Sequence, residues 1–243
     1  MRLAAAVAVA FVATTHVSAD AVSAVPVALT VSPARAELLA PSSRTLQLSN
    51  RGSERLAVDV AWRPLDLRIP PHGWLIVAPS RLVLRSGGRA LLTVRAGSGA
   101  SPGDHNLLVL LTGRPVDGGG RVAVRLRVGV RIRVRAPGRL LRKLALGGLR
   151  VQRFNAKRAL VVAVANRGNV TEQLRGRLTV TLVDHNRVIS QLRYGKAREL
   201  YPDARTVVVL PYAGRAHGVM TAVVRIRLGA RACPLERRYR LLL

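Results

Sequence analysis

A row of arginines in the middle of the chain has the spacing most suggestive of binding chemistry. Within Arg121–Arg135 every even position is apolar, and the odd positions include Arg125, Arg127, Arg131, Arg133 and Arg135. In an extended strand, residues two positions apart lie about 6.6 Å apart on one face. That distance is close to the repeat of a phosphodiester chain, so the row could bind an anionic polymer, with an affinity that falls as salt rises. The alternative is a solvated face whose charge protects a sheet edge from aggregation.

The other residues whose side chains could act in catalysis or bind a metal do not form a recognisable catalytic or metal-binding pattern. Two triplets repeat, Asp104-His105-Asn106 and Asp184-His185-Asn186. Both fall at predicted strand edges, where Asp and Asn commonly form turns, so we interpret both as turn residues. The sequence contains no zinc-protease helix motif, nucleophile elbow or phosphate-binding loop. We therefore expect a non-enzymatic protein without cofactor or metal.

The net charge indicates an affinity for anions without naming one. The formal charge is +28, and nearly all of it comes from arginine. A field of this size attracts nucleic acid, anionic wall polymers and acidic lipid headgroups alike. Aromatic residues make up only 3% of the chain and no nucleic-acid recognition motif is present, so we expect no specific nucleic-acid partner. Cys233 is the single cysteine, which excludes an intrachain disulfide.

The N-terminus has the pattern of a secretory signal peptide. Met1-Arg2 is a short positive region, Leu3–Ala13 is apolar throughout, and Val17-Ser18-Ala19 places small residues at a cleavage site. The apolar run is well short of the roughly 20 residues that span a bilayer, although an uncleaved anchor is the alternative. We predict a signal peptide at residues 1–19, no transmembrane span after cleavage, and an extracytoplasmic location in the periplasm or cell envelope.

The mature chain is predicted to be all-β. Short runs with apolar residues at alternate positions, such as Leu56–Trp62 and Ala90–Val94, are separated by turn signals such as Ser86-Gly87-Gly88. Seven or eight such strands in about 110 residues are typical of an immunoglobulin-like sandwich. One segment, Arg139–Phe154, is ambiguous, because its leucines could begin a short helix that Gly147-Gly148 would end.

An internal repeat divides the chain into two domains. Asn50-Arg51-Gly52 returns as Asn166-Arg167-Gly168, an offset of 116 residues (166 minus 50), and Leu84 corresponds to Leu200 at the same offset. The fold class is therefore two tandem immunoglobulin-like β-sandwich domains after the signal peptide, at residues 25–134 and 135–243. Arg121–Arg135 becomes the last strand of the first domain, with a bend at Gly129 and the domain boundary at Pro137-Gly138.

Several stretches of the first half share a known family pattern. They read Val31-Ser32-Pro33-Ala34-Arg35, Leu46-Gln47-Leu48-Ser49-Asn50, Trp62-Arg63-Pro64 and Trp74-Leu75-Ile76-Val77-Ala78-Pro79. About 90 residues of this half resemble the N-terminal domain of PapD-like pilus chaperones. The resemblance implies that a basic residue of the first strand and one of the last strand hold the client's C-terminal carboxylate. Arg35 would be the first of these residues, and Arg125 or Arg127 the second.

The same resemblance implies that the last strand pairs with a client. Pilus chaperones leave alternating apolar residues of that strand free to complete the sheet of the client. In this chain the residues concerned would be Val124, Leu126 and Val128.

The second half is similar to a different group of modules. Asn166–Thr171 and Arg198–Pro202 resemble the Ig-like modules of bacterial surface proteins, including the WxL-associated type, which are taken to bind wall or host surface components.

Two functions follow as hypotheses from the sequence. The first is an exported binding or assembly protein of the cell envelope, chaperone- or adhesion-like, whose partner is an extracytoplasmic protein client or surface component. The second is a cationic binder of anionic wall or envelope polymers. The residues expected to contact the partner are Arg35, Val124, Arg125, Leu126, Arg127, Val128, Arg131, Arg133 and Arg135.

Overall fold

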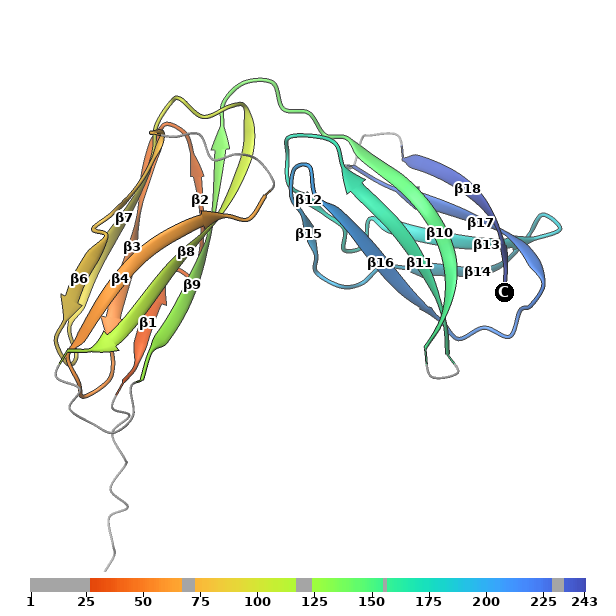
Figure 1. The fold of residues 1–243 in the computed structure, drawn as a ribbon. Coiled ribbons are helices and arrows are strands. Elements are labelled where there is room, and N and C mark those ends of the chain that lie inside the picture. The colour runs from red at the N-terminus through yellow and green to blue at the C-terminus, as the bar shows by residue number, and fades with distance from the viewer. Residues whose placement is uncertain (1–26, 67–72, 117–123, 155–156, 229–233) are drawn as a thin grey trace, which may run out of the picture.

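A computed structural model describes residues 27–66, 73–116, 124–154, 157–228 and 234–243. The predicted signal peptide at 1–19, the beginning of the arginine row at Arg121, and Cys233 lie outside the described residues. The described chain forms two β-sandwiches, and none of its segments is helical (Figure 1). The fold is therefore all-β with two tandem immunoglobulin-like domains, as predicted. Within the same residues, no helix is long and apolar enough to cross a membrane.

Domain one, residues 27–136, consists of two facing sheets. The first sheet contains, in spatial order, β1 (Leu29–Ser32), β3 (Ser42–Asn50), β7 (Arg89–Ala96) and β5 (Leu75–Ala78). The second contains, in spatial order, β2 (Arg35–Leu39), β9 (Leu126–Ala136), β8 (Gly103–Pro115), β4 (Leu56–Pro64) and β6 (Arg81–Leu84). All neighbours are antiparallel except β2 and β9, which run parallel.

The core of domain one follows from the alternation of apolar and polar residues along each strand. Leu46 and Leu48 of β3 point inward, and Val130, Ile132 and Val134 of β9 meet them from the second sheet. Valine and leucine supply most of this core, which agrees with the low aromatic content.

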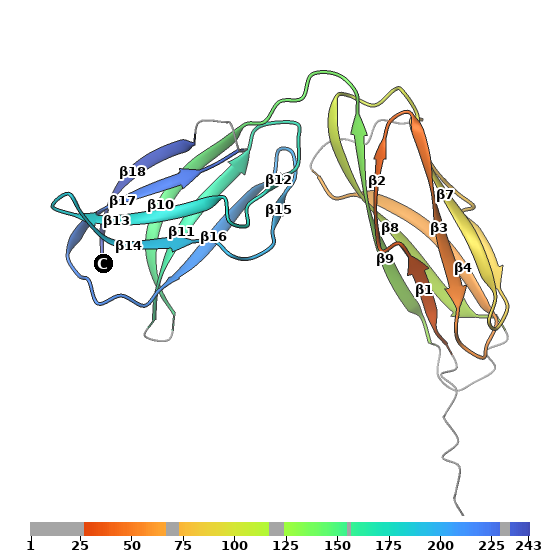
Figure 2. The same ribbon diagram turned by 180° about the vertical axis from the view of Figure 1, so that it is seen from behind.

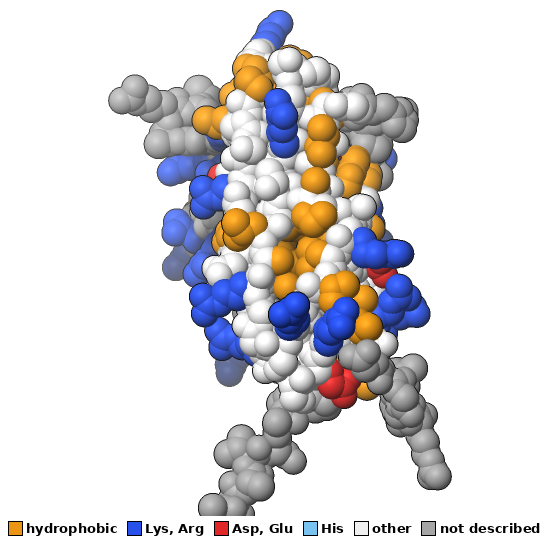
Figure 3. All heavy atoms as spheres, turned by 90° about the vertical axis from the view of Figure 1, so that its left-hand side faces the viewer, with side chains coloured by type: hydrophobic (Ala, Val, Ile, Leu, Met, Phe, Trp, Pro, Cys, Tyr) orange, Lys and Arg blue, Asp and Glu red, His pale blue; other side chains and the backbone are white. Residues whose placement is uncertain are grey.

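The outer side of domain one near β6 and β7 carries exposed apolar residues. Figure 3 shows this side, with apolar side chains along the middle and arginines around them. The large exposed residues on β5, β6 and β7 are Ile76, Val83 and Leu91.

Domain two is built from β10 (Leu144–Phe154) to β18 (Leu235–Leu242). One sheet has, in order, β10, β11 (Lys157–Asn166) and β16 (Arg205–Tyr212). The other has β14 (Arg187–Arg193), β13 (Leu178–Asp184), β17 (Val219–Ile226) and β18. A short pair, β12 (Glu172–Gln173) and β15 (Glu199–Leu200), lies on the side that faces domain one in both views (Figures 1 and 2).

The repeat seen in the sequence is visible in two matching asparagine turns. The Asn50 side chain donates to the carbonyl oxygens of Glu54 and Leu84, and it accepts from the Gly52 N–H. The Asn166 side chain donates to the carbonyl oxygens of Val170 and Leu200, and it accepts from the Gly168 N–H. Every partner is displaced by the same 116 residues (166 minus 50). We refer to these as the two asparagine turns.

The segment Arg121–Arg135 differs from its prediction in length. Its strand, β9, begins at Leu126 and ends at Ala136. It passes through Gly129 without interruption, because β8 pairs with it along its whole length. The strand therefore has no register shift at Gly129, and the bend at this residue stays a prediction. The residues between the domains are 137–143. Leu144–Phe154, the larger part of the ambiguous segment Arg139–Phe154, forms β10 rather than a helix.

Candidate functional site

β9 is held differently along its two halves. On one side, β8 pairs with it from Leu126 to Ala136. On the other side, β2 pairs only with Arg131–Arg135. In the part of the chain that the structure describes, no strand pairs with Leu126–Val130 on this second side. The backbone groups of that segment therefore form an open sheet edge, which is a template for strand addition.

The apolar face of β9 changes along its length in the same way. Val130 and the apolar residues after it are fully buried in the core of domain one. Leu126 and Val128 pack against the core but are only partly buried, and Val124 is 41% exposed. The apolar residues that keep solvent-exposed surface are thus those along the half of β9 that β2 does not pair with. We call Val124, Leu126, Val128 and this unpaired backbone the open edge of β9.

A second group of residues lies between the two domains. Arg35 is in register with Arg131, and Glu37 with Arg133, so their side chains share the outer face of the sheet. The Glu199 carboxylate of domain two reaches this face. It accepts from Arg35 Nη2 at 2.8 Å and from Arg133 Nη2 at 2.7 Å.

These residues line a narrow pocket between the domains. We call Arg35, Arg131, Arg133 and Glu199 the cleft cluster. The pocket is also lined by Glu37, which accepts from Arg133 Nη1 at 2.9 Å, and by Leu65, Asn106, Ile132 and Tyr201. The Glu199 side chain is only 10% exposed, and Gln173 Nε2 lies 3.4 Å from the same oxygen that Arg133 binds. Arg131 is exposed, and it takes part in none of the ion pairs found among the described residues. The cleft therefore contains three arginines and two carboxylates, and these carboxylates already bind Arg35 and Arg133.

Asp104 forms the buried link between the domains. Its side chain is fully buried, and it accepts from Arg135 Nε at 2.7 Å and from the backbone N–H of Thr171 at 2.8 Å. Next to it, Asn106 Nδ2 donates to Thr171 Oγ1 at 2.9 Å. These bonds join β8 of domain one to the segment that follows the second asparagine turn.

The pKa values of two buried carboxyl groups, those of Asp104 and Glu172, are shifted in opposite directions. Burial alone would raise the pKa of Asp104, but the hydrogen bonds from Arg135 and the Thr171 N–H outweigh it, and the pKa is lowered. Burial raises the pKa of Glu172, and the nearby Arg142 and Arg177 offset this only in part. Asp104 is thus held as a carboxylate that stabilises the junction, whereas ionised Glu172 carries a desolvation cost.

The arginine row does not act as one uniform surface. Arg133 and Arg135 form ion pairs with Glu199 and Asp104. Arg127 and Arg131 are exposed on the outer face, and Arg125 precedes the strand. The basic residues nearest Arg35 are therefore Arg131 and Arg133. Arg125 and Arg127, which the resemblance offered for the second carboxylate position, lie at the far end of β9 beside the open edge.

Sequence reasoning missed the junction residues. Asp104-His105-Asn106 was predicted to be a turn, but it lies within β8 and is buried. The similar triplet Asp184-His185-Asn186 does form a turn, with positive φ at His185 and Asn186. The available signal was the Gly103 before the first triplet, which aligns with Gly218 before β17 and marks the beginning of a strand. Nothing in the sequence pointed to Glu199, whose partners come from the other domain.

Comparison with known proteins gives a result at the level of structure. No family model and no curated protein sequence matches the chain. A solved structure described as a chaperone-tip adhesin complex of CFA/I fimbriae biogenesis matches with a TM-score of 0.54 and 13% identity, over 87% of this chain and 98% of that one. The class 5 fimbriae chaperone CfaA matches with a TM-score of 0.52 and 15% identity, over 87% and 98%.

These matches establish the fold. Coverage of this extent includes both domains, so the whole described chain has the two-domain architecture of PapD-like pilus chaperones. The predicted PapD-like fold is confirmed. At these identities the likeness concerns the fold alone. The resemblance of the second half to surface-protein modules stays a prediction.

Proposed function

We propose that the protein is an exported, chaperone-like assembly protein that binds an extended segment of a client by strand addition at the open edge of β9. The observation that carries the proposal is the coincidence of two features on Leu126–Val130. Among the described residues, no strand pairs with one side of this segment, and its apolar residues Leu126 and Val128 are only partly buried. An added strand would satisfy the free backbone groups and cover the exposed apolar surface in one step.

The surroundings of the edge support this proposal. Strand pairing supplies affinity through backbone bonds, and specificity comes from alternate side chains. Val124, Leu126 and Val128 would contact the apolar residues of the client segment. The neighbours named in the solved structures, a chaperone-tip adhesin complex and a fimbrial chaperone, have the same fold and suggest a subunit of a surface assembly as the client.

The cleft cluster gives the client a second contact. Arg131 lies beside Arg35 in the strand register, and Glu199 of domain two forms an ion pair with Arg35. A client carboxylate entering the cleft would bind Arg131 and compete with Glu199 for Arg35. This refines the residues that the family resemblance implied, because Arg131 replaces Arg125 or Arg127 as the second basic residue.

The test is site-specific crosslinking in intact cells. A photoreactive residue at Leu126 should capture one protein species, which mass spectrometry identifies. The double substitution L126T/V128T should reduce this product at least about fivefold, because it removes apolar contact while leaving a strand-forming residue. Near-ultraviolet circular dichroism, which reports on Trp62 and Trp74 of domain one, establishes that the variant is folded.

A matched control separates strand addition from general stickiness. V188T/I189T removes exposed apolar surface from β14, an edge strand of domain two. This control should leave the crosslink at Leu126 unchanged. Equal loss in both variants, or an undiminished crosslink in folded L126T/V128T, would contradict the proposal.

The second candidate function is binding of an anionic envelope polymer. The charge of +28 and the exposed Arg127 and Arg131 favour it. Retention on purified wall material should then fall steeply between low and high salt, and R127Q/R131Q should make the slope of log affinity against log salt shallower by about 1 to 2. A retention that does not depend on salt would exclude this function.

A further inference from the structure

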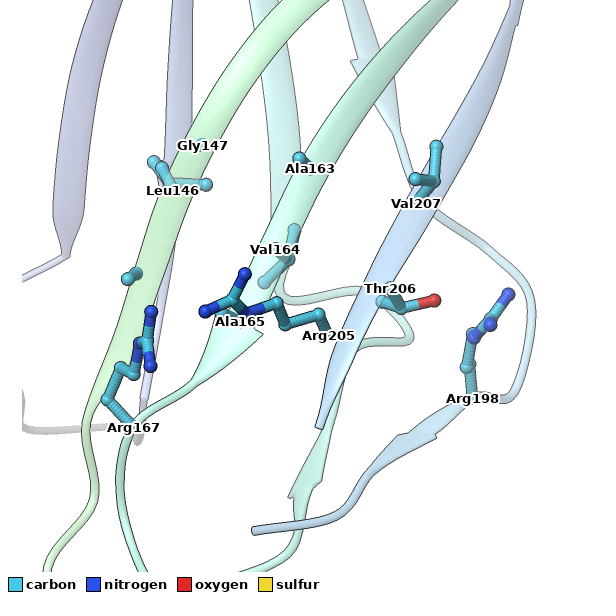
Figure 4. Close-up of a pocket in the computed structure, with 11 residues that line it drawn as sticks. Leu146, Gly147, Ala163, Val164, Ala165, Arg167, Arg198, Arg205, Thr206 and Val207 are labelled. Atoms are coloured by element: carbon cyan, nitrogen blue, oxygen red, sulfur yellow. The ribbon is translucent and has the colours of Figure 1, made fainter. Parts of the chain in front are cut away.

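A hollow of about 610 Å³ lies on domain two (Figure 4). It shares no lining residue with the open edge or the cleft cluster, although its Arg198 is the chain neighbour of Glu199. Pockets that bind small molecules commonly have volumes of about 300–1,000 Å³. The hollow involves all three strands of the β10-β11-β16 sheet. It is lined by Ala145, Leu146, Gly147, Ala163, Val164, Ala165, Arg167, Arg198, Arg205, Thr206 and Val207.

The floor of the hollow is apolar and made of small side chains. Ala163 and Ala165 of β11 alternate with the core residues Val162 and Val164, so they belong to the outer face. In register, Ala163 pairs with Val207 of β16, and Ala165 pairs with Ala145 of β10. The short side chains leave room for a ligand where larger residues would fill the space.

The rim of the hollow is cationic. Figure 4 shows Arg205 extending from β16 toward Ala165, with Arg167 pointing toward the same region and Arg198 on the other side of β16. The guanidinium groups of Arg167 and Arg205 therefore lie over the same part of the hollow and repel each other, and a bound anion would relieve this repulsion.

We propose that this hollow binds an organic phosphate with a compact apolar substituent. A phosphate monoester carries up to about two negative charges near neutral pH and three acceptor oxygens, and the planar guanidinium group binds such oxygens in pairs. Arg167 and Arg205 would hold the phosphate, and the substituent would lie on Ala163, Ala165 and Val207. Arg198 completes the cationic rim. The site is independent of the proposed strand addition.

The experiment measures the affinity of the full chain for hexyl phosphate by isothermal titration calorimetry at fixed ionic strength. Hexyl phosphate should bind at least about tenfold more tightly than inorganic phosphate, because only the former covers the apolar floor. The variant R167Q/R205Q should lose at least about tenfold in affinity.

Two further variants decide where the ligand binds. R187Q/R193Q makes the same change in net charge on β14, and its affinity should match that of the wild type within about twofold if the hollow is the site. A165L fills the floor from the solvent side and should weaken binding about tenfold. If R187Q/R193Q loses as much affinity as R167Q/R205Q, or if folded A165L binds normally, the proposal is wrong.

The source of the phosphate is settled by a second probe. Monomeric dihexanoyl phosphatidate and vesicles containing phosphatidate are compared in the same titration. Binding of both, lost in A165L, identifies a lipid headgroup. Binding of the soluble phosphates alone identifies a free metabolite-like phosphate. Failure of every phosphate to bind the wild type more tightly than it binds R167Q/R205Q would overturn the proposal.

Discussion

The two asparagine turns are nearly identical in their internal bonds and different in what they contact. In domain one, the residues after Asn50 include Ser53 and Arg55, which are exposed. In domain two, the corresponding Asn169 and Thr171 take part in the junction: Asn169 Nδ2 donates to the Pro102 carbonyl, and the Thr171 N–H donates to Asp104. The same local structure is free in one copy and forms an interface in the other.

The two turns share the residues that stabilise each sandwich and differ in the residues that form the contact between the domains. The bonds of the asparagine itself are repeated, so they serve the sandwich. The residues three to six positions later differ, so they serve the contact between domains. The largest change of residue type is at Leu56, which is fully buried in domain one and whose counterpart at the offset of 116 (172 minus 56) is the buried Glu172. Arg142 and Arg177 accompany the glutamate, and leucine needs no such partners.

Substituting each of Leu56 and Glu172 by the other residue type should produce the largest difference in unfolding free energy between the two domains. L56E places a carboxylate in an apolar core without arginines and should cost about 4 kcal/mol or more of unfolding free energy. E172L should change it by about 1 kcal/mol or less, because it removes the desolvation cost of the carboxylate, and the partly exposed Arg142 and Arg177 can be solvated without it. Urea unfolding, followed by tryptophan fluorescence for domain one and circular dichroism for both domains, measures the two values. Equal losses would show that the two positions are equivalent after all.

Removing the asparagine side chains tests the shared part of the turns. N50A and N166A should each cost about 3 kcal/mol, because each leaves buried backbone carbonyl groups without donors. N166A should also weaken the junction, since the same turn positions Asn169 and Thr171. Hydrogen exchange of the β8 amides would detect this second effect. N186G, at the exposed hairpin with positive φ, serves as the neutral control.

The link made by Asp104 should give an intermediate effect with a distinct pH dependence. D104N should cost about 2 kcal/mol at neutral pH, because it removes the charge that Arg135 binds. The pKa of Asp104 is lowered, so its stabilisation is present above the usual value of 3.8 and is lost as the pH falls through the folded-state value. The gap between wild type and D104N should therefore narrow below about pH 4. If the difference in unfolding free energy between wild type and D104N widened below pH 4, the pKa of Asp104 would be raised and not lowered.

The smallest effect is expected at Glu199. E199Q should lower the unfolding free energy by only about 1 kcal/mol, because Arg35 and Arg133 keep contact with solvent. Its visible consequence should be in the arrangement of the domains, measured by small-angle scattering. Q191E on β14 is a suitable control, because it changes charge without touching the cleft. If E199Q and wild type scatter identically, Glu199 does not hold the domains together.

The sequence predicted the parts of this molecule that depend on local pattern. Alternation gave the strands, and Asn50 and Asn166 with their glycines gave the two domains. The contacts between domains could not be predicted in this way. Glu199 meets Arg35 across 164 positions of the chain, and only the folded arrangement brings them together. Likewise, the same residue types form a turn at Asp184–Asn186 and a buried strand at Asp104–Asn106, because the surrounding fold decides which groups they can bond.

Finally, the short reach of β2 sets a limit on stoichiometry. Because β2 stops pairing at Arg131, the free part of β9 runs only from Leu126 to Val130, roughly 17 Å at about 3.3 Å per residue. That length matches a single strand of ordinary size. A complex formed there would contain one client segment for each chain, and the paired remainder of β9 would stop the added sheet from growing further along the strand.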